Sequence, residues 1–284
     1  MKVIHSVSET RQWLADKRSM GRTVGLVPTM GALHAGHLDL VGRASRENDI
    51  SGCSIFVNPI QFNNPEDLAK YPRTLENDLI LLKKAGCMLV FVPSAEEMYP
   101  EPVKKKFDFG ALEKVMEGAH RPGHFNGVAV VVEKLFDIFR PDRAYFGEKD
   151  FQQLRIIQAL VKIEDIPVEI VPCPTVREPD GLAMSSRNRR LSQDERAVAP
   201  GIYQTLLFAK DHVLKIPVTE LKKLCTAMLE DKGFRVDYFE IADPVTLQPV
   251  KTWEASAGAI ACVAAFLGSV RLIDNMFLFA NFAR

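Results

Sequence analysis

Two histidines three residues apart, His34 and His37, are the side chains of this sequence whose types and spacing most clearly suggest chemistry. They follow a β-branched segment, residues 23–27, that predicts a buried strand, and they precede apolar residues at helical spacing over residues 38–44. Both imidazoles should therefore lie on one side of the first turn of a helix. Unpaired N–H groups and the helix dipole favour an anion there, and glycines on both sides of His34 let a ligand approach the backbone. The segment predicts a phosphate-binding turn.

Two other interpretations of the histidine pair compete with this one. Two imidazoles can be zinc ligands, but zinc normally takes a third and a fourth ligand, and no Cys or Glu stands at a matching offset nearby. The pair can also be two ordinary polar residues at a helix start, although the flanking glycines would then have no evident purpose. The nucleotide-phosphate interpretation is favoured over both.

Residues 147–153 repeat the pattern of the first turn: a strand end, a glycine, a cation and a helix start. Lys149 could meet a phosphate there as a point charge. Gln153 lies one turn into the helix, and Gln61 lies on another loop after a strand. Two such glutamines would suit a small polar substrate that carries hydroxyls. The alternative is a surface Lys–Asp pair with a solvated Gln153, and Gln61 as an ordinary polar loop residue.

The segment Met-Ser-Ser-Arg at residues 184–187 is the second strong cluster. Two hydroxyls and a guanidinium, just after the flexible Asp-Gly pair at 180–181, can fold over a polyphosphate. Arg187 would neutralise charge that builds on a departing pyrophosphate. Such a string also occurs in ordinary loops, but in one chain with His-x-Gly-His, and in this order, it becomes specific.

Strands that alternate with helices up to residue 173 must position these clusters. This alternation predicts an α/β fold, a Rossmann-like doubly wound parallel sheet that binds ligands at the carboxyl ends of its strands. Two helices and three strands then predict a smaller α+β domain with an antiparallel sheet. The predicted domains are residues 1–175 and 176–284. The predicted strands are 23–27, 50–57, 88–92, 143–147, 168–173, 236–241, 259–265 and 270–279, and the helices are 6–20, 34–47, 74–86, 124–139, 150–161, 192–214 and 219–232.

Composition excludes several classes of protein. The 36 basic residues equal the 36 acidic ones, so no global field attracts nucleic acid or an anionic membrane. Five cysteines, odd in number and never in Cys-x-x-Cys, argue against a disulfide framework and for a reduced compartment. No secretory signal and no membrane-length apolar run is present. We therefore expect a cytoplasmic protein with neither nucleic-acid nor membrane partners.

The two signatures in this order resemble those of class I aminoacyl-tRNA synthetases and related nucleotidyltransferases. Within that superfamily, the sequence is most similar to the pantothenate synthetase (pantoate–β-alanine ligase) family. Arg187 stands where synthetases have their second lysine, and Ala183 precedes Met184, which is usual for the pantothenate branch. The similar segments cover nearly the whole chain: 27–34, 56–62, 71–74, 121–125, 146–153, 180–188 and 271–275.

The resemblance implies an ATP-dependent ligation in two steps. The carboxylate of pantoate attacks the α-phosphate of ATP, giving pantoyl adenylate and pyrophosphate. The amine of β-alanine then attacks the acyl carbon and releases AMP and pantothenate. His37 is implied to be the proton donor, with His34 beside it on phosphate. Gln61 and Gln153 are implied to hold pantoate, and Gln61 also to meet β-alanine.

Lys149 and Arg187 complete the implied catalytic set, and a homodimer is implied as the assembly. Mg²⁺ should arrive bridging the ATP phosphates with few protein ligands, so no residue is assigned to it. Asp78 is either a helper of the metal or a solvated helix residue. The implied ATP contacts are Met30, Gly31, Ala32, Leu33, His34, Ala35, Gly36, His37, Gly147, Glu148, Lys149, Asp150, Val176, Met184, Ser185, Ser186 and Arg187.

Three other functions compete with the ligase. A nucleotidylyltransferase that moves AMP onto a phosphate would share the first turn and would not need β-alanine. A tRNA synthetase is disfavoured by the balanced charge and by the short stretch after the sheet, which leaves little room for an anticodon-binding domain. A non-catalytic adenylate-binding regulator would have lost His37 or Lys149, and both are present.

Overall fold

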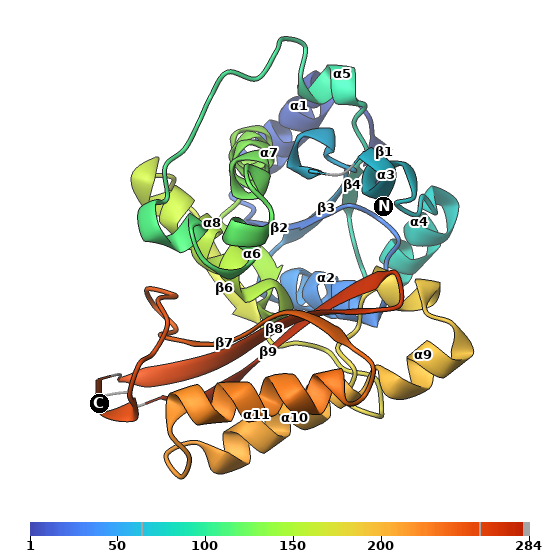
Figure 1. Cartoon of the computed structure of the whole chain (residues 1–284). Helices are drawn as coiled ribbons and strands as arrows, with labels where there is room; N and C mark the ends of the chain where they lie inside the picture. The colour runs from blue at the N-terminus through green and yellow to red at the C-terminus, as the bar shows by residue number, and fades with distance from the viewer. Residues whose placement is uncertain (64, 256, 281–284) are drawn as a thin grey trace. The chain divides into compact units, whose positions relative to one another are not determined.

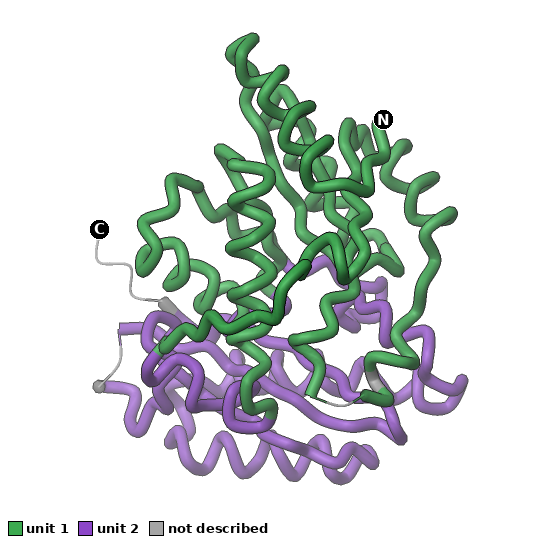
Figure 2. The backbone as a smooth tube through the Cα atoms, turned by 90° about the horizontal axis from the view of Figure 1, so that it is seen from above, with its two compact units in different colours: residues 1–109, 121–148, 153–174 green, residues 110–120, 149–152, 175–284 purple. Residues whose placement is uncertain are grey.

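A computed structural model describes residues 1–63, 65–255 and 257–280 of the chain. The chain divides into two compact units, which Figure 2 colours separately. The first comprises residues 1–109, 121–148 and 153–174, and the second comprises residues 110–120, 149–152 and 175–284. Two short segments from the N-terminal part of the sequence thus belong to the second unit. Residues 281–284 of the predicted C-terminal domain lie outside the described residues.

The first unit contains a parallel sheet of six strands in the order β1-β4-β3-β2-β5-β6. The chain winds from β2 to β3 and β4 in one direction and adds β5 and β6 on the other side of β2. A doubly wound sheet binds ligands where its strand order reverses, here outside the carboxyl ends of β2 and β5. The strands are β1 (Lys2–Ile4), β2 (Val24–Thr29), β3 (Ile50–Ile55), β4 (Leu89–Phe91), β5 (Arg143–Gly147) and β6 (Glu169–Cys173).

Helices cover both faces of this sheet (Figure 1). On one face, Val41 of α2 and Leu82 of α4 pack in one buried cluster with Val27 of β2. On the other face, Phe139 of α7 meets Phe91 of β4 with ring centroids 6.0 Å apart. The helical segments of this region are α1 (Val7–Arg18), α2 (Ala35–Glu47), η1 (Pro59–Gln61), α3 (Pro65–Ala69), α4 (Leu75–Lys84), α5 (Ala95–Met98), α7 (His124–Phe139), η3 (Glu148–Asp150) and α8 (Phe151–Ile163).

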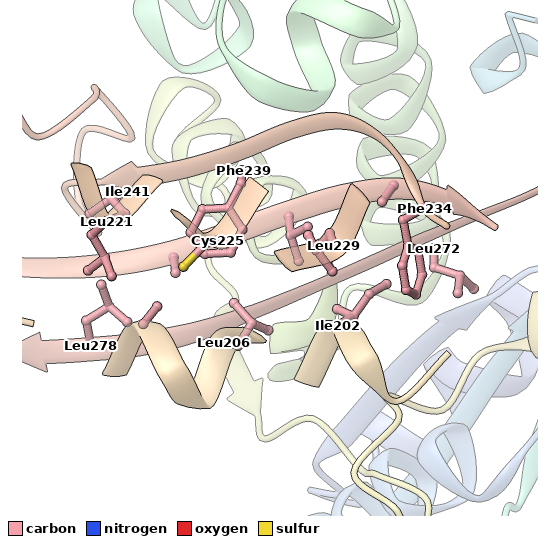
Figure 3. Close-up of a cluster of buried hydrophobic side chains, with 14 of the residues drawn as sticks. Ile202, Leu206, Leu221, Cys225, Leu229, Phe234, Phe239, Ile241, Leu272 and Leu278 are labelled. Atoms are coloured by element: carbon pink, nitrogen blue, oxygen red, sulfur yellow. The ribbon is translucent and has the colours of Figure 1, made fainter. Parts of the chain in front are cut away.

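The second unit is built on a three-stranded antiparallel sheet in the order β7-β8-β9. α10 and α11 bury one apolar face each against it, and Figure 3 shows Leu206 and Leu229 in this cluster with Phe239 of β7. The elements of this unit are η2 (Gly110–Glu113), α6 (Met116–His120), η4 (Ser186–Arg190), α9 (Gln193–Val198), α10 (Gly201–His212), α11 (Val218–Glu230), β7 (Arg235–Ala242), η5 (Trp253–Ala255), β8 (Gly258–Leu267) and β9 (Val270–Ala280).

The predicted fold class is confirmed, and two elements coincide with their predicted bounds, α7 and β5. The edge strand β1 was not predicted. The helix predicted over residues 192–214 is two helices, α9 and α10, because Pro200 has no N–H to continue the first. The strand predicted to reach residue 57 ends at Ile55. Within the described residues, every helix is too short or too polar to cross a bilayer.

Candidate active site

The turn that follows β2 is the first candidate segment. The hydroxyl of Thr29 donates to the carbonyl oxygen of Ser54 at 2.7 Å and accepts from the N–H of Gly31 at 3.2 Å. Gly31 and Ala32 have positive φ angles of 79° and 51°, so the chain turns sharply before α2 begins. A positive φ is uncommon for a residue with a side chain and needs support from its surroundings.

Asp78 of α4 supplies this support. Its two carboxylate oxygens accept hydrogen bonds from the N–H groups of Ala32 and Leu33, each at 2.9 Å. The Thr74 hydroxyl donates to the same carboxylate at 3.2 Å. Asp78 is only 1% exposed, so its interpretation as a solvated helix residue is wrong. The carboxylate fixes the backbone that leads into the histidine pair.

His34 and His37 form a reciprocal cap on the first turn of α2. The Nδ1 atom of His34 accepts from the N–H of Gly36 at 3.2 Å, and the Nδ1 atom of His37 accepts from the N–H of His34 at 3.4 Å. The ring centroids lie 4.1 Å apart, and both side chains are half-buried. Because Nδ1 accepts in each neutral ring, the proton lies on Nε2. Each ring thus presents an N–H donor at a helix N-terminus, where an anion is favoured.

Gln61 is tied to the same turn through Met30. Its Nε2 donates to Met30 Sδ at 3.2 Å, and its Oε1 accepts from Asn58 Nδ2 at 3.0 Å. Asn58 is oriented in turn by the Tyr99 hydroxyl, which donates to Asn58 Oδ1 at 2.8 Å. Burial raises the pKa of Tyr99, so this hydroxyl keeps its proton and remains a donor. The amide of Gln61 is therefore held with its oxygen and nitrogen in defined positions.

The backbone of Gln61 is fixed by α7. The ring nitrogen Nδ1 of His124 lies 2.8 Å from the carbonyl oxygen of Gln61, and Asn58 Nδ2 donates to the carbonyl oxygen of Gly127 at 3.1 Å. A Cβ atom on Gly127 would lie 2.5 Å from the carbonyl oxygen of Ile60 and 2.7 Å from Gln61 Cα. Only glycine permits this close approach of a helix to the loop.

Three further predicted residues of the first unit lie at the end of β5 or after it. Gly147 ends the strand, and Glu148 begins η3. Burial raises the pKa of Glu148. Gln153 is half-buried in the first turn of α8.

Lys149 and Asp150 lie in the second unit. The ammonium Nζ of Lys149 lies 3.2 Å from Asp150 Oδ2, so the predicted alternative of a Lys–Asp pair is present. The Lys149 side chain is only 17% exposed, however, and its position is not that of a solvated surface pair. Its carbonyl oxygen accepts a hydrogen bond from Asn275 Nδ2 at 2.9 Å. The peptide that carries the cation is thereby anchored to β9.

The Met184–Arg187 segment begins at the end of a small hairpin. Val176 accepts at its carbonyl oxygen from the N–H of Met184 at 3.0 Å, and Arg177 bridges Ala183 as in an antiparallel pair. Ser185 caps η4 by accepting from the N–H of Arg187 at 3.2 Å. Ser186 is buried, and Arg187 is half-buried.

The predicted residues thus fall into two sets. The first unit brings together the residues from Met30 to His37 and Gln61, and it also carries Gly147, Glu148 and Gln153. The second unit carries Lys149, Asp150, Val176 and the segment 184–187. Among residues 1–63, 65–255 and 257–280, no group of three or more His, Cys, Asp or Glu side chains could hold a metal ion.

Sequence reasoning missed the residues that orient these groups. Asn58 and His124 contact Gln61, Tyr99 orients Asn58, and Asn275 holds Lys149 from β9. Asn58, His124 and Asn275 lie inside segments noted for their resemblance to a family, which was the available signal. Nothing local in the sequence marks Tyr99.

Comparison with known proteins decides the family. A model of the pantoate-beta-alanine ligase family matches residues 2–277. The chain belongs to this family. A pantothenate synthetase of Bacteroides thetaiotaomicron is 54% identical over 277 residues, which are 97% of this chain and 98% of that protein.

Solved structures agree with this family assignment. The crystal structure of pantothenate synthetase from Thermus thermophilus superposes with a TM-score of 0.91 at 46% identity, covering 98% of this chain and 100% of that one. A pantoate-beta-alanine ligase from Francisella tularensis, complexed with beta-gamma ATP and beta-alanine, gives a TM-score of 0.82 at 34% identity, covering 98% of both chains. The predicted family and the predicted ligase activity, which joins pantoate to β-alanine, are both confirmed.

Proposed function

We propose that this ligase couples pantoate to β-alanine through a pantoyl adenylate formed from ATP. The observation that carries the proposal is the histidine turn. His34 and His37 present paired Nε2–H donors at the N-terminus of α2, over a backbone that Asp78 fixes. The Francisella tularensis relative that was solved with an ATP derivative and β-alanine supports ATP as the nucleotide.

In the first step, a carboxylate oxygen of pantoate forms a bond to the α-phosphorus of ATP, and the bond from that phosphorus to the bridging oxygen of pyrophosphate breaks. Two anions must approach each other, so charge has to be neutralised. His37 donates a hydrogen bond from its Nε2–H to the phosphate oxygens, and His34 binds beside it. Lys149 and Arg187 take up the negative charge that builds on pyrophosphate. Residues 30–37 and 147–150 and the backbone around Val176 contact the nucleotide, and residues 184–187 close over its phosphates.

In the second step, the amine of β-alanine forms a bond to the acyl carbon, the bond from that carbon to the phosphate oxygen breaks, and AMP leaves. Gln61 and Gln153 hold pantoate through their amides, and Gln61 also meets β-alanine. The network from Tyr99 through Asn58 keeps the Gln61 oxygen engaged and points its nitrogen toward Met30. A fixed amide orients the acid with little loss of entropy on binding.

We also propose the remaining properties implied by the resemblance. Mg²⁺ would accompany ATP and would help to neutralise the charge of its phosphates, without a dedicated set of protein ligands. Residues 1–175 act as the ATP- and pantoate-binding domain, and residues 176–284 act as a smaller domain that carries the Met-Ser-Ser-Arg loop. The enzyme works in the cytoplasm as a homodimer.

Exchange of labelled pyrophosphate into ATP tests the first step. The wild-type protein should exchange only when pantoate is present, and adding β-alanine should then release AMP and pantothenate. His37→Ala and Lys149→Ala should nearly abolish exchange while circular dichroism shows an intact fold. The matched controls His5→Ala and Lys104→Ala replace exposed residues and should exchange normally.

Two results would contradict the proposal. Exchange that proceeds without pantoate, or AMP release that ignores β-alanine, points to a nucleotidylyltransferase that acts on a phosphate acceptor. Wild-type exchange in His37→Ala or Lys149→Ala removes that residue from the mechanism.

A further inference from the structure

The dipeptide Asp274-Asn275 in β9 belongs to a segment that resembles the family, yet the mechanism above gives it no role. Both residues are buried, with exposures of 4% and 8%. Strand positions this deep in an antiparallel sheet usually carry apolar side chains. Two adjacent polar residues at such positions must be satisfied by partners, and those partners identify what the dipeptide does.

Asn275 holds the peptide of Lys149. Its Nδ2 donates to the carbonyl oxygen of Lys149 at 2.9 Å, across a large separation in sequence. Two residues further along each chain segment, Phe151 and Phe277 meet edge to face, with ring centroids 5.4 Å apart. One hydrogen bond and one aromatic contact therefore fix the segment 149–151 on β9.

Asp274 holds the hairpin that leads into Met184–Arg187. Its two carboxylate oxygens accept from Nη1 and Nη2 of Arg177 at 2.6 and 3.0 Å, a bidentate pair. The same guanidinium donates to the carbonyl oxygen of Gly181 at 3.0 Å and lies over the ring of Tyr203 at 4.4 Å. Asp274 Oδ1 also accepts from the N–H of Asn275 at 2.8 Å, which ties the two anchors together.

We propose that Asp274 and Asn275 are positioning residues for ATP: from adjacent positions of one strand, they fix the Lys149 segment and the Met184–Arg187 loop at a constant separation. This inference rests on the proposed role of those two segments in binding the triphosphate. Neither side chain needs to touch the nucleotide. A triphosphate binds best when its cations are already spaced to match its oxygens, and a rigid strand provides that spacing.

Steady-state kinetics of the full-length enzyme test this role. Asn275→Asp keeps the shape but replaces the donor to Lys149 by a carboxylate, and Asp274→Asn leaves one guanidinium N–H without an acceptor. Each should raise KM for ATP in the exchange reaction by about tenfold, the effect of one lost hydrogen bond, while KM for pantoate stays within about twofold. The matched control is Asp237→Asn, which breaks the Asp237–Arg271 pair of the same sheet. It should lower thermal stability without raising KM for ATP.

Direct ATP binding, measured by calorimetry without pantoate, provides a second readout for variants with low turnover. Asn275→Asp should weaken ATP binding in the wild-type background and should add no further loss in a Lys149→Ala background, because the anchored cation is then absent. An unchanged ATP affinity and KM in both dipeptide variants, with a stability loss like that of Asp237→Asn, would overturn the inference. The proposed function would still stand in that case, provided that Lys149→Ala abolishes exchange. Normal exchange by Lys149→Ala would overturn the proposed function itself.

Discussion

Replacing Asp78 by Asn tests whether a buried carboxylate shapes the histidine turn. The native carboxylate accepts from the N–H groups of Ala32 and Leu33 at 2.9 Å each. An amide offers one acceptor oxygen, so one N–H would face an NH₂ group and remain unpaired, at a cost of about 1–3 kcal/mol. The surviving bond would change from charged to neutral and lose about 1 kcal/mol. In total, the hydrogen bonds that hold the turn bearing His34 and His37 would lose about 2–4 kcal/mol.

The pyrophosphate-exchange assay and urea unfolding together measure this effect. If all of this free energy keeps the turn in its binding shape, kcat/KM for ATP should fall by about 30- to 900-fold in Asp78→Asn. Glu76→Gln changes an exposed carboxylate of the same helix and should alter neither quantity. Loss of stability with unchanged kcat/KM would show that the carboxylate supports the fold but not the turn. Unchanged values of both would refute the reasoning outright.

Two further substitutions test the geometry around the sheet. Gly127→Ala places a Cβ against the backbone of the Gln61 loop, so the free energy of unfolding in urea should fall by about 1–3 kcal/mol and KM for pantoate should rise. The control Gly42→Ala, in the middle of α2, should instead raise the free energy of unfolding by up to about 1 kcal/mol. An unaltered KM in Gly127→Ala would contradict the proposed role of the loop. The backbone N–H of Thr23, more than the nearby Arg22, lowers the pKa of Asp49 from 3.8 to about 2, so this carboxylate stabilises the fold above pH 3.8 and loses that effect as the pH falls toward 2. The stability difference between wild type and Asp49→Asn should shrink over that interval, and a difference independent of pH would contradict the assignment.

Elements with a strong local pattern could be predicted from the sequence. α7 is apolar over nearly its whole length and is bounded by Gly123 and Arg140, both with positive φ, so its ends coincide with the prediction. β1 has three residues and gains its strand geometry only by pairing with β4, so its own sequence gives too little signal. The split between α9 and α10 is itself predictable from the sequence, because Pro200 stands inside the segment predicted as one helix.

Some residues of the candidate site could likewise be predicted from local sequence, and others could not. The His-x-Gly-His turn was recognisable because its glycines and histidines are neighbours in sequence. Asp78 was not, since a carboxylate near a helix start is usually solvated and its partners lie on another element. Asn275 presents the same difficulty: an Asn in a strand looks unfavourable until its contact with Lys149 is known.

In both units, the residues proposed to contact substrates are distinct from the residues that fix their positions. The groups proposed to meet the substrates lie on turns, on short 3₁₀ segments or in the first turn of a helix. The groups that fix these segments lie inside regular elements, Asp78 on α4 and Asp274 and Asn275 on β9. A turn without such support would sample many conformations, and ordering it when the nucleotide binds would reduce the affinity. Anchoring each turn by charged or amide groups from a rigid element removes that loss before the nucleotide arrives. Substitutions at the anchors should therefore weaken ATP binding before they change the chemistry, whereas substitutions at His37 or Lys149 should remove the chemistry itself.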